Sequence, residues 1–315
     1  SVAIGVNALF SQNGTNGSVY NVAVGKNAGF AITTGTNNTI VGGLAGDALT
    51  TGSFNVALGV AALGADDLGS HAVAVGYGAL ESQNYATATN GYNTAVGSNA
   101  GYAVTTGKDN TLIGGLTGDA LLTGEFNVAV GKSALSADTD GGYNVGVGAL
   151  ALTTQNFTTT TNSYNTAVGG LAGRRITAGV ENTIIGGLAG DHLTDADYNV
   201  AIGYAALTSD TLGSRSVAIG RNALVSQNFT TATASNNTAV GYEAGRNTTT
   251  GIDNVLYGSN AGYALTDADD NVALGRSALA TDTLGSKSTA VGNGALNTQN
   301  FTSATDSNNV AVGYN

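Results

Sequence analysis

A five-residue pattern of alternating side chains recurs along the whole chain and ends each time in glycine. Its consensus is Asn-(Val/Thr)-Ala-(Val/Ile/Leu)-Gly. Because apolar side chains alternate with period two, the pattern predicts a short β-strand. Positions in each copy are numbered below from this repeat glycine. The repeat glycines are Gly5, Gly25, Gly42, Gly59, Gly76, Gly97, Gly114, Gly131, Gly148, Gly169, Gly186, Gly203, Gly220, Gly241, Gly258, Gly275, Gly292 and Gly313.

The spacing of these glycines is regular. From Gly25 onward the steps are 17, 17, 17 and 21 residues, and this quartet recurs four times as a 72-residue super-repeat. A fixed short period is the signature of a solenoid. Alanine follows at position +3 in nearly every copy, and we expect it on the opposite wall of a thin coil. We therefore predict an all-β fold, a parallel β-solenoid (β-roll) of 18 coils that forms one continuous repeat domain over residues 1–315.

The strand alternation also suggests which side chains face inward. Positions −1 and −3 are mostly Val, Ile, Leu or Thr, and we assign them to the interior. Position −2 then faces outward and is mostly alanine. In the second coil of each super-repeat it is a large aliphatic residue, which is unfavourable in water. These four residues are our candidate self-association face: Ile40, Leu112, Ile184 and Leu256.

Position −4 is asparagine in 14 of the 18 coils. Stacked coils lie roughly 4.8 Å apart, and identical asparagines at that spacing can hydrogen-bond into a ladder. An alternative is that asparagine simply favours the turn before the strand. The candidate ladder residues are Asn21, Asn38, Asn55, Asn93, Asn110 and Asn127.

The 21-residue coil carries four extra residues, with a recurrent Gln-Asn-(Phe/Tyr) element followed by a Thr-rich run. Recurring once per four coils, these elements would lie roughly 19 Å apart on one side of the solenoid. A row of receptor or glycan contacts is one interpretation, because weak identical sites gain strength by multivalency. The other is that each ring folds back over its own coil or clamps a neighbouring chain. The candidate contact residues are Tyr85, Phe157, Phe229 and Phe301.

Composition excludes several classes of function. The chain lacks Pro, Cys, Met and Trp, and its formal charge of −11 disfavours nucleic acid and anionic membrane surfaces as partners. Its two histidines, His71 and His192, do not recur between super-repeats, and no catalytic, cofactor-binding or metal-ligand motif is present. We expect neither enzyme activity nor a cofactor nor a metal site. No apolar stretch is long enough to insert into a membrane.

The pentapeptide Ser-Val-Ala-Ile-Gly occurs at residues 1–5 and 216–220, with close variants in the other coils. In this it resembles the head repeats of YadA-like trimeric autotransporter adhesins, and similar repeats occur in some bacteriophage tail fibres. The resemblance implies a left-handed roll and a homotrimer. It also implies that Val2, Ile4, Val217 and Ile219 lie in the core, with Ala3 and Ala218 at the interface between chains.

These observations predict a structural and adhesive fibre segment, extracellular and on a cell or virion surface, with side loops that contact a host receptor or glycan. The alternative is a self-assembling filament or a phage tail-fibre shaft without receptor contact in this segment. The sequence opens inside one repeat and closes inside another. We therefore expect it to be an excerpt of a longer chain.

Overall fold

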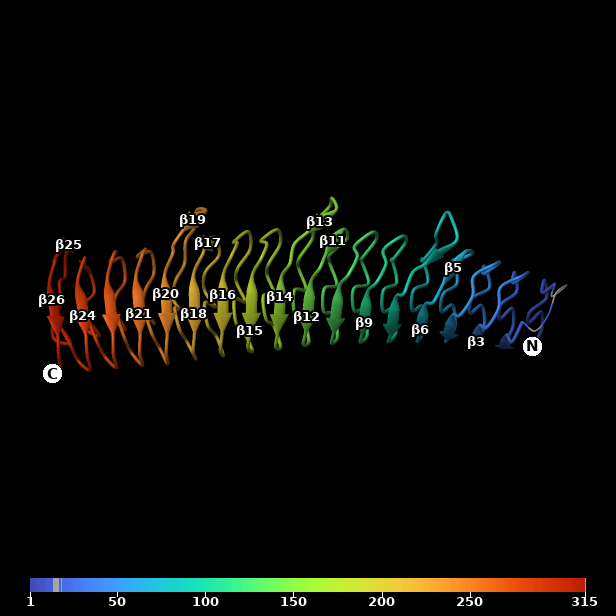
Figure 1. Cartoon of the computed structure of the whole chain (residues 1–315), viewed down its shortest axis with the longest axis horizontal. Coiled ribbons are helices and arrows are strands. Elements are labelled where there is room, and N and C mark those ends of the chain that lie inside the picture. Colours follow the sequence, from blue (N-terminus) through green and yellow to red (C-terminus); the bar gives the residue numbers. More distant parts are fainter. Residues whose placement is uncertain (14–16, 18, 315) are drawn as a thin grey trace. The chain divides into compact units, whose positions relative to one another are not determined.

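A computed structural model of the chain describes residues 1–13, 17 and 19–314. Its contacts divide the chain into two compact units, Ser1–Ser163 and Tyr164–Asn315, each described here by itself. Asn315, the last residue of the predicted repeat domain, lies outside the described residues. Both units are built from short strands joined by turns, and the described residues contain no helix (Figure 1).

Unit 1 has nine three-residue strands that form its main sheet and two pairs of two-residue strands. The main strands are β1 (Val2–Ile4), β2 (Val22–Val24), β3 (Thr39–Val41), β4 (Val56–Leu58), β6 (Val73–Val75), β8 (Thr94–Val96), β9 (Thr111–Ile113), β10 (Val128–Val130) and β12 (Val145–Val147). The short pairs are β5 (Gly69–Ser70) with β7 (Thr89–Asn90), and β11 (Gly141–Gly142) with β13 (Thr161–Asn162).

Unit 2 repeats this arrangement. Its main strands are β14 (Thr166–Val168), β15 (Thr183–Ile185), β16 (Val200–Ile202), β18 (Val217–Ile219), β20 (Thr238–Val240), β21 (Val255–Tyr257), β22 (Val272–Leu274), β24 (Thr289–Val291) and β26 (Val310–Val312). The short pairs are β17 (Gly213–Ser214) with β19 (Thr233–Ala234), and β23 (Gly285–Ser286) with β25 (Thr305–Asp306).

Every main strand within a unit pairs in parallel with the equivalent strand of the next coil. In unit 1, Val2, Ala3 and Ile4 align with Val22, Ala23 and Val24, and later coils keep this register. In unit 2, Val200 aligns with Val217 in the same way. The predicted all-β solenoid, with about 18 parallel stacked coils, is confirmed.

The predicted facing of the strands is wrong. Position −2 is the buried position: Ala23, Ala57 and Ala129 are fully inaccessible to solvent. Positions −1 and −3 face outward, as shown by Leu58 at −1 and Val128 at −3, which are 46% and 37% exposed. The four residues proposed as a self-association face are also 0% exposed and belong to the core: Ile40, Leu112, Ile184 and Leu256. Val217 and Ile219, which the resemblance placed in the core, are half-buried, whereas Ala218, which it placed at the interface between chains, is fully buried. In the first coil Ala3, Val2 and Ile4 are all exposed.

The core explains why these large residues point inward. In the coils that carry them, position +4 is glycine, and the aliphatic side chain fills the space that a side chain there would occupy. A Cβ added to Gly46 would lie 3.0 Å from Ile40 Cδ1, and one added to Gly190 would lie 2.5 Å from Ile184 Cδ1. The interior between the two facing walls is thin, so a large residue on one wall requires a small residue opposite it.

The repeat glycine itself allows the coils to stack closely. Gly59 has φ +141°, a conformation that residues with a side chain rarely adopt. A Cβ on it would lie 2.3 Å from the carbonyl oxygen of Gly76 in the next coil. Any larger residue would therefore separate the coils at this bend.

Adjacent residues of β15 provide a direct test of the facing. Ile184→Ala should lower the free energy of unfolding by about 2–5 kcal/mol, because it opens a cavity in the core. Ile185→Ala should cost about 1 kcal/mol or less, because that side chain is partly in solvent. Urea unfolding of dilute protein measures both. Equal losses, or a larger loss for Ile185→Ala, would contradict the assigned facing.

Candidate functional site

The predicted asparagine ladder is present within each unit. Each side chain bonds to backbone groups, and some amides also bond to one another, as Asn127 Nδ2 donates to Asn110 Oδ1 at 3.1 Å. Asn110 Oδ1 accepts a hydrogen bond from the Asn127 N–H at 3.0 Å, and its Nδ2 donates to the Gly124 carbonyl at 2.9 Å. Asn21, Asn38, Asn55 and Asn93 bond forward in the same way. Each buried amide therefore takes the place of a peptide group where the backbone turns.

The ladder changes at the 21-residue coil, where the glutamine of the Gln-Asn-(Phe/Tyr) element joins it. Asn93 Nδ2 donates to Gln83 Oε1 at 2.8 Å. In unit 2, Asn237 Nδ2 donates to Gln227 Oε1 at 2.9 Å. The element that looked like a contact motif is thus part of the buried hydrogen-bond network.

A buried aspartate in the preceding coil completes this network. Gln155 Nε2 donates to Asp138 Oδ2 at 2.6 Å, and the Phe157 and Gly141 N–H groups donate to Asp138 Oδ1 at 3.0 and 3.1 Å. The same aspartate–glutamine clasp occurs at three other places: Asp66 with Gln83, Asp210 with Gln227, and Asp282 with Gln299. The clasp holds the residues that precede the extra segment of the long coil.

The aromatic rings of this element are covered, so the prediction that they are surface contacts is wrong for three of them. Tyr85, Phe157 and Phe229 are 4%, 9% and 6% exposed, and Phe301 is half-buried. Tyr85 Oη also donates to the Gly107 carbonyl at 2.9 Å. The rings pack against adjacent coils of the same chain: a Cβ added to Gly213, in the coil before Phe229, would lie 2.7 Å from Phe229 Cδ2.

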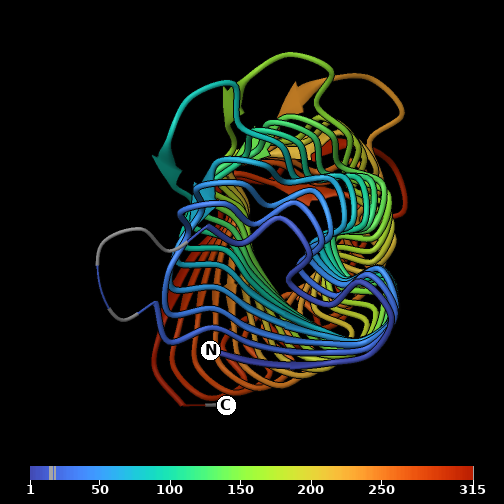
Figure 2. The ribbon, with the colours of Figure 1, turned by 90° about the vertical axis from the view of Figure 1, so that its right-hand side faces the viewer.

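What the long coils present to solvent is the segment after each ring. Residues 86–88 and 158–160 in unit 1, and 230–232 and 302–304 in unit 2, are exposed. Figure 2 shows the loops that carry β7 and β13 standing out from the coils of unit 1. These clasped side loops contain threonine or serine at their tips and offer hydroxyl groups on a rigid base.

A row of aromatic residues on the surface was not predicted. Position −5 has a left-handed backbone in coil after coil, with φ 62° at Phe54 and 59° at Phe126. In unit 1, Phe54 stacks on His71 with centroids 5.0 Å apart, and Phe126 stacks on Tyr143 at 4.8 Å. The sequence signal was available, since aromatic residues recur at the position before the ladder asparagine.

Two other features of the described part of the chain were candidates for a binding site: a cluster of metal ligands and a hollow at the last coil. No group of three or more His, Cys, Asp or Glu side chains converges within residues 1–13, 17 and 19–314. The same residues contain no helix that could cross a membrane.

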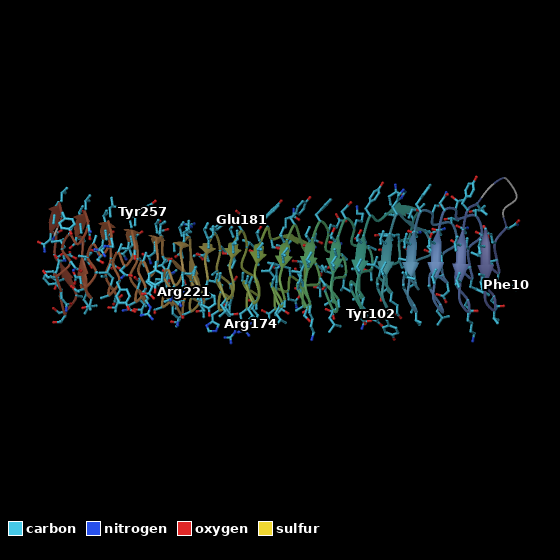
Figure 3. All side chains as sticks on the ribbon, turned by 90° about the horizontal axis from the view of Figure 1, so that it is seen from below. Phe10, Tyr102, Arg174, Glu181, Arg221 and Tyr257 are labelled. Carbon is cyan, nitrogen blue, oxygen red and sulfur yellow. The ribbon has the colours of Figure 1, made fainter. Side chains whose placement is uncertain are left out.

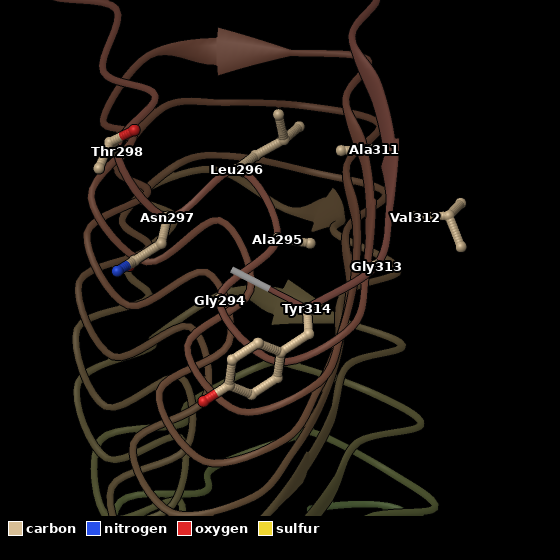
Figure 4. Close-up of a pocket in the computed structure, with 9 residues that line it drawn as sticks. All are labelled: Gly294, Ala295, Leu296, Asn297, Thr298, Ala311, Val312, Gly313 and Tyr314. Carbon is tan, nitrogen blue, oxygen red and sulfur yellow. The ribbon is translucent and has the colours of Figure 1, made fainter.

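The hollow at the last coil, of about 310 Å³, is lined by Ala295, Leu296 and Ala311 (Figure 4). These positions are covered by the next coil elsewhere, so the hollow is the uncovered stacking surface of that coil.

Comparison with known proteins gives no family: no protein-family model and no curated protein matches the chain.

The buried clasp predicts a pH dependence of stability. Burial raises the pKa of the Asp66 and Asp138 carboxyl groups above the ordinary value of 3.8, although hydrogen bonds from Gln83 and Gln155 oppose the shift. The folded protein therefore holds these protons more tightly than the unfolded chain. Their contribution to stability is fully present below about pH 3.8 and is lost as the pH rises through the raised values.

We expect the thermal midpoint to fall between pH 4 and pH 7, and to fall less in the double variant Asp66→Asn, Asp138→Asn. The quantity to compare is the change of the thermal midpoint with pH. The midpoint itself also shifts, because the asparagine amides of the double variant alter the hydrogen bonds of the clasp. The double variant Asp195→Asn, Asp267→Asn, which removes two exposed carboxylates, controls for the change in net charge. A double variant with the slope of the unmodified protein would refute the role of these two carboxyl groups.

Proposed function

We propose that this chain is a structural segment of an extracellular fibre, which associates with further copies of itself and displays its clasped side loops for attachment. The observation that carries this proposal is the outward face of the main sheet in each unit. That face consists of positions −1 and −3, which are Val, Thr, Ile, Leu or Tyr and never charged.

A face of this kind is unfavourable in water. In unit 2, Ile185, Val255 and Leu274 are 38%, 39% and 37% exposed, and Tyr257 is 59% exposed. They belong to parallel strands of the same sheet and form one apolar surface. Contiguous apolar surface of this extent is typical of a protein–protein interface. Arg174 and Arg221 project from the side of unit 2 opposite Tyr257, whereas Glu181 lies on the same side as Tyr257 but outside the main strands (Figure 3).

A second copy of the same chain is the partner that fits this face best. The face repeats the same few residues at every coil, so that two or three copies side by side would match apolar rows along the whole length of a unit. Closed symmetric assemblies of identical chains are the most common oligomers. The self-association surface is therefore the −1/−3 face, and the −2 residues support it from inside.

The side loops are the part of the structure that supports a role in attachment. The Asp138–Gln155 clasp holds the base of one loop, while its threonine-rich tip stays in solvent. Loops repeated once per super-repeat, in each copy of an assembly, would bind a surface by many weak contacts at once. This arrangement suits attachment better than turnover of a substrate.

Sedimentation or light scattering tests self-association. One chain has a mass of 30.9 kDa, and we expect a solution mass of a small multiple of this value, with three copies as the leading case. The double variant Ile185→Lys, Leu274→Lys should give the mass of a single chain, because two ammonium groups would have to be buried in the contact.

The control is Tyr242→Lys, which introduces one ammonium group at an exposed residue outside the main strands. It should leave the mass unchanged. A single-chain mass for the unmodified protein, or loss of assembly in the control alone, would contradict the proposal. An open series of larger species would favour a filament.

A further inference from the structure

A groove of about 390 Å³ lies in unit 1 beneath the second side loop. Its polar lining includes the hydroxyl groups of Thr106, Thr123 and Thr160 and the side-chain amide of Asn162. Its apolar edge is the stacked ring pair Phe126 and Tyr143. The groove thus combines aromatic surface with hydroxyl and amide groups, in the size range of small-molecule sites.

The repeat pattern is broken at this groove. Asp140 lines it, whereas the equivalent residue of the other super-repeats is leucine: Leu68, Leu212 and Leu284. Thr160 is also confined to this super-repeat, because the other three have alanine in its place: Ala88, Ala232 and Ala304. Asn162 recurs once, as Asn90 of the first super-repeat. Only the second super-repeat therefore carries the full polar lining.

A second difference from the other super-repeats leaves a backbone N–H without its usual acceptor. In the other three super-repeats a serine hydroxyl accepts a hydrogen bond from the N–H of the residue one coil earlier, at 3.0 Å in each case: Ser70 from Ser53, Ser214 from Asp197, and Ser286 from Asp269. In this super-repeat Gly142 replaces that serine. Within the described residues the N–H of Glu125 has no protein acceptor. It is left available to a ligand in the groove.

The carboxylates of the groove are held by other groups. Glu125 pairs with Lys108 at 3.3 Å, and Asp140 accepts hydrogen bonds from the hydroxyls of Thr123 and Thr139. They therefore present oriented acceptor oxygens. A divalent cation would require six to eight converging oxygens, and an anion would meet two carboxylates. A neutral ligand that both donates and accepts hydrogen bonds fits this lining.

We propose that this groove binds a hexose unit of a neutral glycan. The hydroxyl groups of the sugar would donate to the Asp140 and Glu125 carboxylates and accept from the Glu125 N–H and the hydroxyls of Thr106 and Thr160. Its C–H surface would contact the exposed edges of Phe126 and Tyr143, which are 42% and 41% exposed. The inference rests on the adhesive half of the proposed function and is independent of self-association.

Saturation-transfer NMR with lactose, maltose and cellobiose tests the site, since these probes present three different linkages between neutral hexoses. We expect transfer to at least one of them at millimolar concentration. The double variant Asp140→Leu, Gly142→Ser restores the residues of the other super-repeats and should therefore fold. Its affinity for that sugar should fall at least about tenfold.

The matched control is Asp195→Leu, which makes the same change at an exposed turn of unit 2 and should bind the sugar unchanged. The inference is overturned if none of the three sugars gives transfer, or if the double variant binds as well as the unmodified protein. The solution mass of the same samples separates this result from a failure of the fibre proposal, which would appear as a single-chain mass.

Discussion

The stacking of each unit depends on one interaction, the hydrogen bonding of a buried asparagine amide to the backbone of the next coil. Asn127 shows it in full: its Oδ1 accepts from the Asn144 N–H at 3.0 Å, and its Nδ2 donates to the Gly141 carbonyl at 2.9 Å. The strands are only three residues long, so that the sheet ladder alone leaves the turns between them unpaired. The amide satisfies those turn groups, which would otherwise be costly to bury.

The side loops are an extension of the same network. Where an extra segment interrupts the regular coil, Gln83 links the ladder residue Asn93 to the buried carboxylate of Asp66. A loop can therefore vary at its tip without disturbing the register of the coils below it. The second super-repeat uses this freedom most, because Asp140 and Gly142 change the surface beside a clasp that is otherwise unaltered. A repetitive scaffold and a single specialised groove are compatible for this reason.

Much of the fold follows from the sequence, because the period of the repeat glycine fixes the coil number and the strand register. Asn38 and Asn110 were also predicted to form a ladder, since one polar residue recurring at strand spacing has few other partners. The facing of the strand could not be read from alternation, because Ala57 and Leu58 are both apolar and alternation says only that they point apart. The missing information was in pairs such as Leu112 with Gly118, where a large residue on one wall matches a glycine on the other. The burial of Tyr85 likewise required knowledge of which groups Asp66 and Gln83 bond.

Hydrogen exchange at the ladder tests this account most directly. In Asn127→Ala the Asn144 N–H and the Gly141 carbonyl lose their partners, and we expect the Asn144 amide to exchange much faster while the protein loses about 2 kcal/mol or more of stability. Asn84→Ala, at an exposed asparagine, should leave both unchanged. Unaltered protection of Asn144 in Asn127→Ala, with stability equal to that of Asn84→Ala, would contradict the claim that the asparagine ladder holds the coils in register.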